Sequence, residues 1–483
     1  MSARSQCLLA LACCAALAGC SMAPHYVRPA APVPSRFGNA AIATPGAGDA
    51  APALPDWRAV FLDPRLRQVI ALGLDNNRDL RVAMLDIDKA RAQYRIQRAA
   101  LAPSLDAAAS SSRQRTSASA STSDTGTAQV GSSDTLQVGI SSWELDLFGR
   151  VRSLKDEALE TWLASAETQR SVRLSLIGEI ADDWLAVGAD QQLLALAQQT
   201  LESQEQTLRR SRDQHDNGIG SGLDLAQIQS SVEAARVDVA RDATQLAQAR
   251  DALQLVVGAP VDAALLAGAD AVDGSVALAP VPAQLDAAVL LQRPDVLAAE
   301  HALKAANADI GAARAAFFPT LTLTASTGRS SDALSTLFSA GARTWSFVPN
   351  LTAPIFHAGA LKASLDVSRI GKDIAVAQYE KAIQSAFGDV ADALAQRDHI
   401  DAQLTAQRAL VEATRRSHTL AEARYRAGVD DYLQVLDAQR SLYAAQQDLI
   451  GLRLQDDSNR VALYTALGGG ADAGAAGPAS SDR

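Results

Sequence analysis

Two long stretches of this 483-residue chain, residues 104–259 and 355–477, contain no proline. Proline breaks a helix because it lacks a backbone N–H and its ring clashes with the preceding turn, so long helices need such stretches. Residues 150–216 hold no helix breaker except two tolerable glycines, Gly178 and Gly188. We therefore expect one helix of about 65 residues there, about 100 Å long at 1.5 Å per residue.

Apolar residues recur every seven positions within the proline-free stretches. The series are Val187, Leu194, Leu201 and Leu208; Leu225, Val232, Val239, Leu246 and Leu253; Val376, Ile383 and Val390, then, after one missed repeat, Leu404 and Val411; and Val435, Leu442 and Leu449. A seven-residue repeat is the signature of helices that wrap left-handedly around their neighbours. The pattern predicts coiled coils whose apolar stripes need partner helices.

Four short segments between the helices have a different character. LDAAASSSRQRTSASASTS and TLQVGISSWELDLFG flank one Ser/Thr/Gly-rich tip, and TLTLTASTGRSS and TWSFVPNLTAPIF flank another. In the third segment Leu321, Leu323 and Ala325 alternate with threonines, a period of two that predicts a strand with one polar face. In a barrel within lipid, the apolar face of such strands would point outward.

The chain repeats itself. RAALAPSL, from Arg98, matches RAAFFPTL, from Arg314, and a glycine turn at Gly218 matches one at Gly428. We therefore predict the same order of elements in each half: a helix, a strand, a tip loop, a second strand, a very long helix, a glycine turn and a long helix. Four strands cannot close a barrel, and an open edge in lipid would leave backbone N–H and C=O groups unsatisfied. The chain must pool strands with copies of itself; two copies would give a narrow filled barrel, and three would give twelve strands around a lumen.

The first twenty residues read as a secretory signal ending in Leu-Ala-Gly-Cys, which resembles a bacterial lipobox. Cleavage before Cys20 would leave that thiol to carry a lipid; the alternative is an ordinary signal peptide with an incidental cysteine. The other three cysteines lie in the removed part, so the mature chain would have no disulfide and no cysteine-based metal site. The net charge of −10 argues against a nucleic-acid partner.

Several further segments carry a resemblance to a known family. They are LALGLDNNRDLRVA, RPDVLAAEHALKAANADIGAARAAFFPTLTL, SWELDLFGR, APIFHAGALKASL, ARYRAGVDDYLQVLDAQRSLYAAQQDLI and VALYTALGGG. With them the chain resembles the outer-membrane efflux lipoproteins of the TolC-like superfamily, in the branch that serves resistance-nodulation-division pumps. The resemblance implies a mainly α-helical protein with a membrane β-barrel. Each chain would contribute four strands and long coiled-coil helices to a homotrimer, which forms a twelve-stranded barrel and a helical periplasmic tunnel.

These observations divide the chain into six expected segments: a signal peptide (1–19), a lipid-anchored extended N-terminal segment (20–64), a first repeat (65–257), a linker or equatorial segment (258–285), a second repeat (286–467) and a disordered C-terminal tail (468–483). The resemblance implies a passive exit duct in the outer membrane. An inner-membrane pump would load small toxic compounds, and a periplasmic adaptor would link the pump to the duct. No cofactor is expected beyond the covalent lipid on Cys20.

In this family coiled-coil tips carrying Asp, Arg and Leu close the periplasmic end of the tunnel. Carried onto this sequence, the aperture residues are Leu433, Asp437 and Arg440. At 100° per residue these three side chains share one helical face, opposite Val435 and Leu436. A ring of three carboxylates on a threefold axis would attract cations. The alternative is a solvated Asp–Arg pair one turn apart.

The resemblance also implies contacts between neighbouring tips, for which Asp224, Tyr425 and Arg426 are the candidates. The two glycine turns, with Gly218, Ile219, Gly428 and Val429, would dock the adaptor. The alternative interpretation is that these residues only form the turns, since glycine supplies the positive φ that a helical hairpin needs. The two interpretations are compatible. One departure is His357, which stands where many relatives have Asp.

Other classes of function fit the sequence less well. The six histidines lack metal-ligand spacing, and the chain has no Gly-x-Ser-x-Gly or P-loop motif, so an enzyme is not expected. The carboxylates lie mainly on outer heptad positions, which are usually solvated. A lipid-anchored periplasmic coiled-coil scaffold and a type-I protein secretion duct remain as alternatives. The four strand segments oppose the scaffold, because it would not need them.

Overall fold

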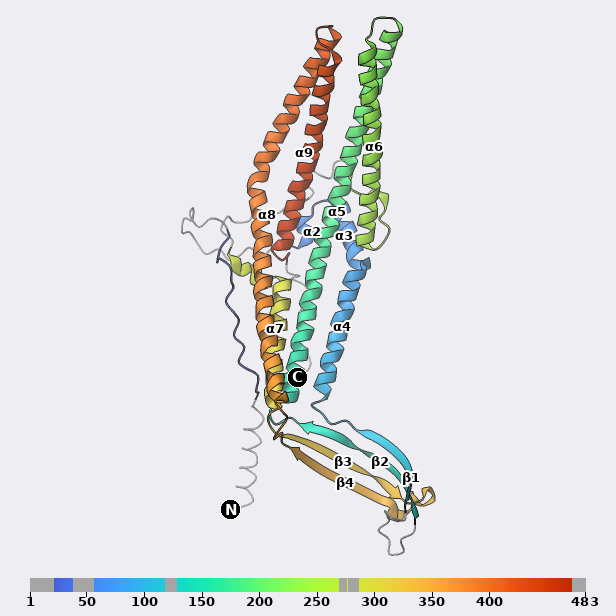
Figure 1. Cartoon of the computed structure of the whole chain (residues 1–483), viewed down its shortest axis with the longest axis vertical. Helices are drawn as coiled ribbons and strands as arrows, with labels where there is room; N and C mark the ends of the chain where they lie inside the picture. Colours follow the sequence, from blue (N-terminus) through green and yellow to red (C-terminus); the bar gives the residue numbers. More distant parts are fainter. Residues whose placement is uncertain (1–20, 38–55, 118–127, 269–275, 277–285, 471–483) are drawn as a thin grey trace. The chain divides into compact units, whose positions relative to one another are not determined.

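The computed structural model describes residues 21–37, 56–117, 128–268, 276 and 286–470. The predicted signal peptide, Cys20, most of the linker and residues 471–483 lie outside the described residues. The chain divides into two compact units. The sheet unit comprises 1–30, 86–166 and 298–379, and the hairpin unit comprises 31–85, 167–297 and 380–483. Figure 1 labels the elements of both.

The sheet unit contains the four predicted strands. They are β1 (Asp106–Thr116), β2 (Gln129–Leu145), β3 (Thr320–Ser331) and β4 (Arg343–Thr352). All neighbours pair antiparallel in the order β1-β2-β3-β4. Within the four-stranded sheet of one chain β4 is an edge strand, so the missing N–H of Pro349 breaks no pairing on its outer side there.

One face of this sheet is apolar. Directly opposite residues share a face, and on this face Leu321 opposes Leu351 while Ala325 opposes Phe347. A β-bulge between Ile140 and Trp143 places two residues of β2 against one of β3. The extra residue keeps the apolar side chains before and after it on the same face.

The other face carries small polar side chains, such as those of Thr322, Thr324 and Ser326, and the hydroxyls of Ser326 and Ser346 lie 2.8 Å apart. On the apolar face, Trp345 is 78% exposed. An apolar face without protein cover is expected of strands that face lipid.

The two halves of the chain produce matching helices. α5 (Arg150–Asp216) and α8 (Ala360–Arg426) have 67 residues each, which confirms the predicted very long helices. α6 (Gly222–Val257) and α9 (Tyr432–Ala466) follow the two glycine turns, and α4 (Arg78–Ala99) and α7 (Pro294–Ala315) precede the strands.

The core of the hairpin unit surrounds α5. α3 (Pro64–Asn76) begins after Asp63, whose carboxylate accepts from the Arg65 N–H at 2.7 Å and caps the helix. Trp184 of α5 is fully buried, and its indole N–H donates to the Leu265 carbonyl at 2.8 Å. Shorter elements complete the chain: α2 (Trp57–Val60) and the 3-10 turns η3 (Ala263–Leu265), η4 (Ala287–Gln292), η5 (Leu334–Thr336) and η6 (Ala340–Ala342). α2 lies within the segment 20–64 that was expected to be extended.

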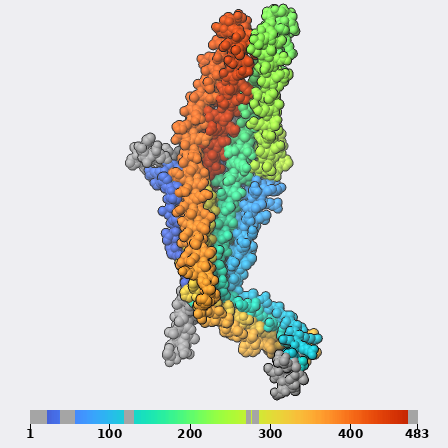
Figure 2. Space-filling view, viewed as in Figure 1, coloured from blue at the N-terminus to red at the C-terminus, as the bar shows by residue number. Residues whose placement is uncertain are grey.

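The α5–α6 and α8–α9 hairpins pack on each other near their turns. Figure 2 shows the two hairpins, green and orange to red, side by side. Ile228 and Val232 of α6 form a buried cluster with Tyr432, Val435 and Leu436 of α9. Val232 and Val435 belong to the heptad series predicted from the sequence, whereas the other three residues lie outside those series.

Candidate functional site

Both helical hairpins turn through the same backbone motif. Gly218 and Gly428 have φ values of 74° and 69°. The next residue in each turn donates its N–H back across the turn, Ile219 to the Gln214 carbonyl at 2.9 Å and Val429 to the Arg424 carbonyl at 3.0 Å. This is the Schellman arrangement that ends a helix.

Gly218 and Gly428 are required by their backbone angles rather than by crowding. A Cβ built on Gly218 or Gly428 would meet no atom within 4 Å, but a side chain is strained at positive φ. The residues that follow, Ile219 and Val429, are 80% and 61% exposed. Each turn thus presents an exposed apolar side chain on a hydrogen-bonded loop.

The structure brings Tyr425 of α8 and Asp224 of α6 into electrostatic contact. Burial raises the pKa of Tyr425, and the negative charge of Asp224 raises it further. The Tyr425 ring also meets the Tyr432 ring edge-on, with centroids 5.4 Å apart. The third predicted contact residue, Arg426, donates within its own helix to Glu422.

The three predicted aperture residues lie on one exposed face of α9. Leu433 is 43% exposed, and Asp437 and Arg440 are exposed as well. Val435 and Leu436, on the opposite arc, are buried against the neighbouring helices. Among the described residues, Asp437 and Arg440 form no ion pair, so their side chains remain available to other groups.

Sequence reasoning missed an ion pair that spans the second turn. Arg424, at the end of α8, donates through Nε and Nη2 to the carboxylate of Asp430, at 2.5 and 2.9 Å. A bidentate pair of this kind restrains the loop that presents Val429. Its signal in the sequence is an arginine and an aspartate placed on either side of the glycine turn.

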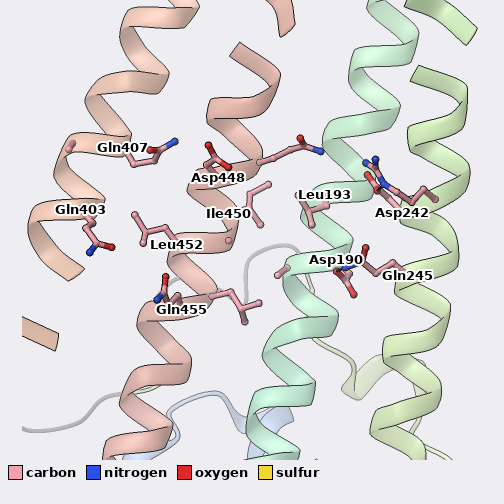
Figure 3. Close-up of a pocket in the computed structure, with 16 residues that line it drawn as sticks. Asp190, Leu193, Asp242, Gln245, Gln403, Gln407, Asp448, Ile450, Leu452 and Gln455 are labelled. Carbon is pink, nitrogen blue, oxygen red and sulfur yellow. Dashed lines mark hydrogen bonds and ion pairs between the residues drawn. The ribbon is translucent and has the colours of Figure 1, made fainter. Parts of the chain in front are cut away.

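A polar cavity of about 920 Å³ lies farther along the same face of α9. Figure 3 shows that α5, α6, α8 and α9 all contribute to its lining. On α9 the lining residues Gln447, Gly451 and Gln455 continue the stripe of Arg440 at spacings of three or four residues, through Ala444. The cavity therefore extends the surface on which the aperture residues lie.

Two buried carboxylates line this cavity. Asp242 is 4% exposed and accepts from the Arg241 Nε at 2.9 Å, and Asp190 accepts from the Gln245 amide at 3.1 Å. Burial raises the pKa of Asp190, and the charge of Asp242 adds to the effect. These two are exceptions to the expectation that heptad carboxylates are solvated.

The described part of the chain holds no group of three or more His, Cys, Asp or Glu side chains arranged for a metal ion. None of its helices is sufficiently long and apolar to span a membrane.

The model of the outer membrane efflux protein family matches residues 69–259 and 287–469, one segment for each half of the internal repeat. The chain belongs to this family. TtgC of Pseudomonas putida, a probable efflux pump outer membrane protein, is 47% identical over 94% of this chain and 93% of its own length. The outer membrane protein OprJ of Pseudomonas aeruginosa is 43% identical over 95% of this chain and 94% of its own length.

Solved structures of outer membrane channels have the same fold. The open state of the MtrE outer membrane channel of Neisseria gonorrhoeae has a TM-score of 0.81 and 39% identity. The match covers 93% of this chain and 98% of MtrE. A membrane protein from Pseudomonas aeruginosa has a TM-score of 0.86 and 42% identity, with 93% and 98% covered. This efflux protein is thus an outer membrane channel component of an efflux pump, as the sequence resemblance implied.

Proposed function

We propose that three copies of this efflux protein form one passive exit duct across the outer membrane. The observation that carries the proposal is the four-stranded sheet, which has one apolar face and two unpaired edges, at β1 and β4. Closing those edges against other copies satisfies the backbone in lipid, and twelve strands leave room for a lumen. The 67-residue helices α5 and α8 would continue the duct into the periplasm.

We propose that the face of α9 with Leu433, Asp437 and Arg440 forms the periplasmic aperture of this duct. Its support is the division of α9 into an exposed polar face and a buried apolar one. Contacts among Asp224, Tyr425 and Arg426 would hold neighbouring tips in the closed arrangement.

The turns at Gly218–Ile219 and Gly428–Val429 would dock a periplasmic adaptor, which connects the duct to a resistance-nodulation-division pump in the inner membrane. Hydrogen-bonded turns with an exposed apolar residue suit such docking, because a loop whose backbone is already ordered loses less conformational entropy on binding. We also propose that a lipid on Cys20 anchors the mature N-terminus.

The substrates we propose are small toxic organic compounds. Relatives that cover nearly all of this chain are named as components of toluene, solvent and antibiotic efflux pumps. Selection among such compounds would belong to the pump, since the duct only conducts them.

One preparation tests the assembly. The full-length protein, extracted in detergent, is expected to have the protein mass of three chains and to insert into planar bilayers as a cation-preferring pore. A monomer that stays soluble without detergent would instead support the coiled-coil scaffold. The protein is also expressed in a host that lacks its own duct. Export of an unfolded polypeptide there, without a gain in solvent tolerance, would support the protein secretion duct.

A further inference from the structure

Four arginines lie on the apolar face of the sheet, all toward the ends where the hairpins turn. Arg329 of β3 and Arg343 of β4 are direct cross-strand partners, and Leu136 of β2 opposes Arg329. On β1, Ala109 pairs with Leu136, and side chains an even number of residues apart share a face of a strand. Arg113 and Arg115 follow Ala109 by four and six residues, so they lie on the same face as Leu136 and Arg329. The apolar face thus ends in a basic border.

Arg329 and Arg343 border a shallow depression of about 380 Å³. Leu136, Val138 and Phe338 supply apolar surface to it. The Arg329 guanidinium is held over the Phe338 ring, 5.8 Å from its centroid, and donates to the Ser339 carbonyl at 2.9 Å. The depression therefore combines a fixed guanidinium, a second arginine and an apolar floor.

The charge of this region is positive. In the described part of the hairpin ends, the four arginines are accompanied by two carboxylates, Asp134 and Asp332. Asp134 lies on the same face as the arginines and is 6% exposed, and four guanidinium groups against two carboxylates leave a net positive charge. None of the four arginines forms an ion pair with a carboxylate of the described residues.

In the proposed trimer, Arg329 and Arg343 would lie near the depth of the lipid phosphates. From Leu321 to Arg329 the strand advances eight residues, about 27 Å at 3.4 Å per residue. With a strand tilt of 35–45° this is about 20 Å along the membrane normal, close to the apolar band of about 25 Å in outer-membrane barrels. Arg113 and Arg115 lie about 14 and 20 Å farther along β1 than the level of Arg329.

We propose that this border binds a phosphorylated glycolipid of the outer leaflet. Arg329 and Arg343 hold a phosphate, whose oxygens match the planar guanidinium fork. An acyl chain of the same lipid lies on Leu136, Val138 and Phe338. Arg113 and Arg115 extend beyond the apolar band, which suits a large phosphorylated sugar headgroup better than a compact glycerophospholipid.

This inference rests on the membrane placement of the sheet in the proposed trimer, where the hairpin ends are extracellular. It adds to that function a lipid that the sheet recognises by charge. The phosphate would also satisfy guanidinium groups that are otherwise costly beside the hydrocarbon.

Native mass spectrometry of the full-length trimer in detergent tests the proposal. The trimer is titrated with diphosphoryl lipid A, with the same lipid after phosphatase treatment, and with phosphatidylglycerol. We expect Arg329→Gln/Arg343→Gln to weaken binding of diphosphoryl lipid A about tenfold or more, because two charge-assisted contacts are lost. Arg113→Gln/Arg115→Gln, which leaves the depression intact, is expected to weaken lipid A binding and to leave phosphatidylglycerol binding unchanged.

The matched control is Arg408→Gln/Arg416→Gln, which removes two exposed arginines of α8 and should bind lipid A like the wild type. Equal binding of the phosphatase-treated lipid, or unchanged binding by both border variants, would overturn the lipid inference. The trimer mass and the pore conductance are read from the same preparation. If the protein is a conducting trimer but binds lipid A equally well with and without its phosphates, only the lipid site is refuted. If the protein is a monomer that does not conduct, the duct itself is refuted.

Discussion

Arg28 and Glu300 are 272 positions apart in the sequence, yet their side chains form an ion pair of 2.6 Å. Glu300 lies on α7 and is 3% exposed. The Tyr26 hydroxyl donates to the same carboxylate at 3.2 Å, and the Lys304 ammonium lies 3.2 Å from it. The pair therefore fastens the described start of the chain to α7.

Replacing Arg28 tests this fastening. Arg28→Ala leaves the buried Glu300 carboxylate without its arginine partner, with Lys304 still close to it. We therefore expect the free energy of unfolding to fall by about 2 kcal/mol. Chymotrypsin should then cut after Tyr26 faster than in the wild type. Arg369→Ala, which removes an exposed ion pair with Asp366, is the control and should change neither quantity. Equal chymotrypsin cleavage in Arg28→Ala and wild type would contradict the assignment.

The same carboxylate predicts a dependence on acid. Burial alone would raise the pKa of Glu300, but hydrogen bonds from Arg28 and Lys304 outweigh it and hold the pKa below its usual value. A lowered pKa contributes stability above the unfolded-state value of about 4.3, and this contribution is lost as pH falls through the lower folded value. The melting temperature of wild type should therefore fall more steeply below pH 4.5 than that of Glu300→Gln. If the melting temperatures of the two proteins fall in parallel with pH, the charge of Glu300 does not contribute this stability.

Asp182 of α5 predicts the opposite trend. Burial is the main cause that raises its pKa to about 6; the Ser458 hydroxyl partly opposes the rise, and the charge of Asp183 contributes to it. A raised pKa means that stability is fully present below the unfolded value of about 3.9 and is lost as pH rises toward 6. Asp182→Asn should remove this loss and be more stable than wild type at pH 7 by about 2 kcal/mol. Asp251→Asn, an exposed control on α6, should follow the wild type at each pH in chemical denaturation.

Local sequence patterns predicted the helices well because their determinants are local. The proline-free stretches and the glycine turns place the boundaries of α5 and α8, and the heptad phase places Val435 inside and Asp437 outside. The strands were found, but β2 begins at Gln129, before the predicted segment, and its bulge near Ser142 was missed. Two adjacent serines in a strand carry no signal that distinguishes a bulge from regular pairing.

Contacts between distant segments could not be predicted in the same way. Nothing near Arg28 in the sequence points to Glu300, and the general expectation that the carboxylates of the heptad helices are mainly solvated did not single out Asp190 and Asp242. Both carboxylates are buried where α5 and α6 pack together, and Asp190 of α5 accepts there from Gln245 of α6. Packing between separate helices leaves no local signal in the sequence. The contact of Asp224 with Tyr425 was expected only through the family resemblance.

The tip turns give a prediction about the adaptor. Ile219→Asp and Val429→Asp place a charge on each exposed apolar position and should weaken binding of the cognate adaptor by about tenfold each, since an apolar anchor is lost. The trimer mass and melting temperature should stay unchanged, because both side chains are exposed. Leu420→Asp, an exposed apolar position of α8 away from the turns, is the matched control. If biolayer interferometry shows that both tip variants bind the adaptor as tightly as the wild type does, the docking surface lies elsewhere.

The aperture face gives the sharpest test of the duct. In a trimer, Asp437 and Arg440 would each occur three times around the axis, so truncating them removes both bulk and charge from the narrowest section. We expect Asp437→Ala/Arg440→Ala to raise the single-channel conductance in planar bilayers, and Asp437→Ala alone to weaken block by multivalent cations. Asp251→Asn removes an exposed carboxylate of α6 and should leave both properties unchanged. Wild-type conductance and cation block in the double variant would show that the constriction lies at another level of the helices.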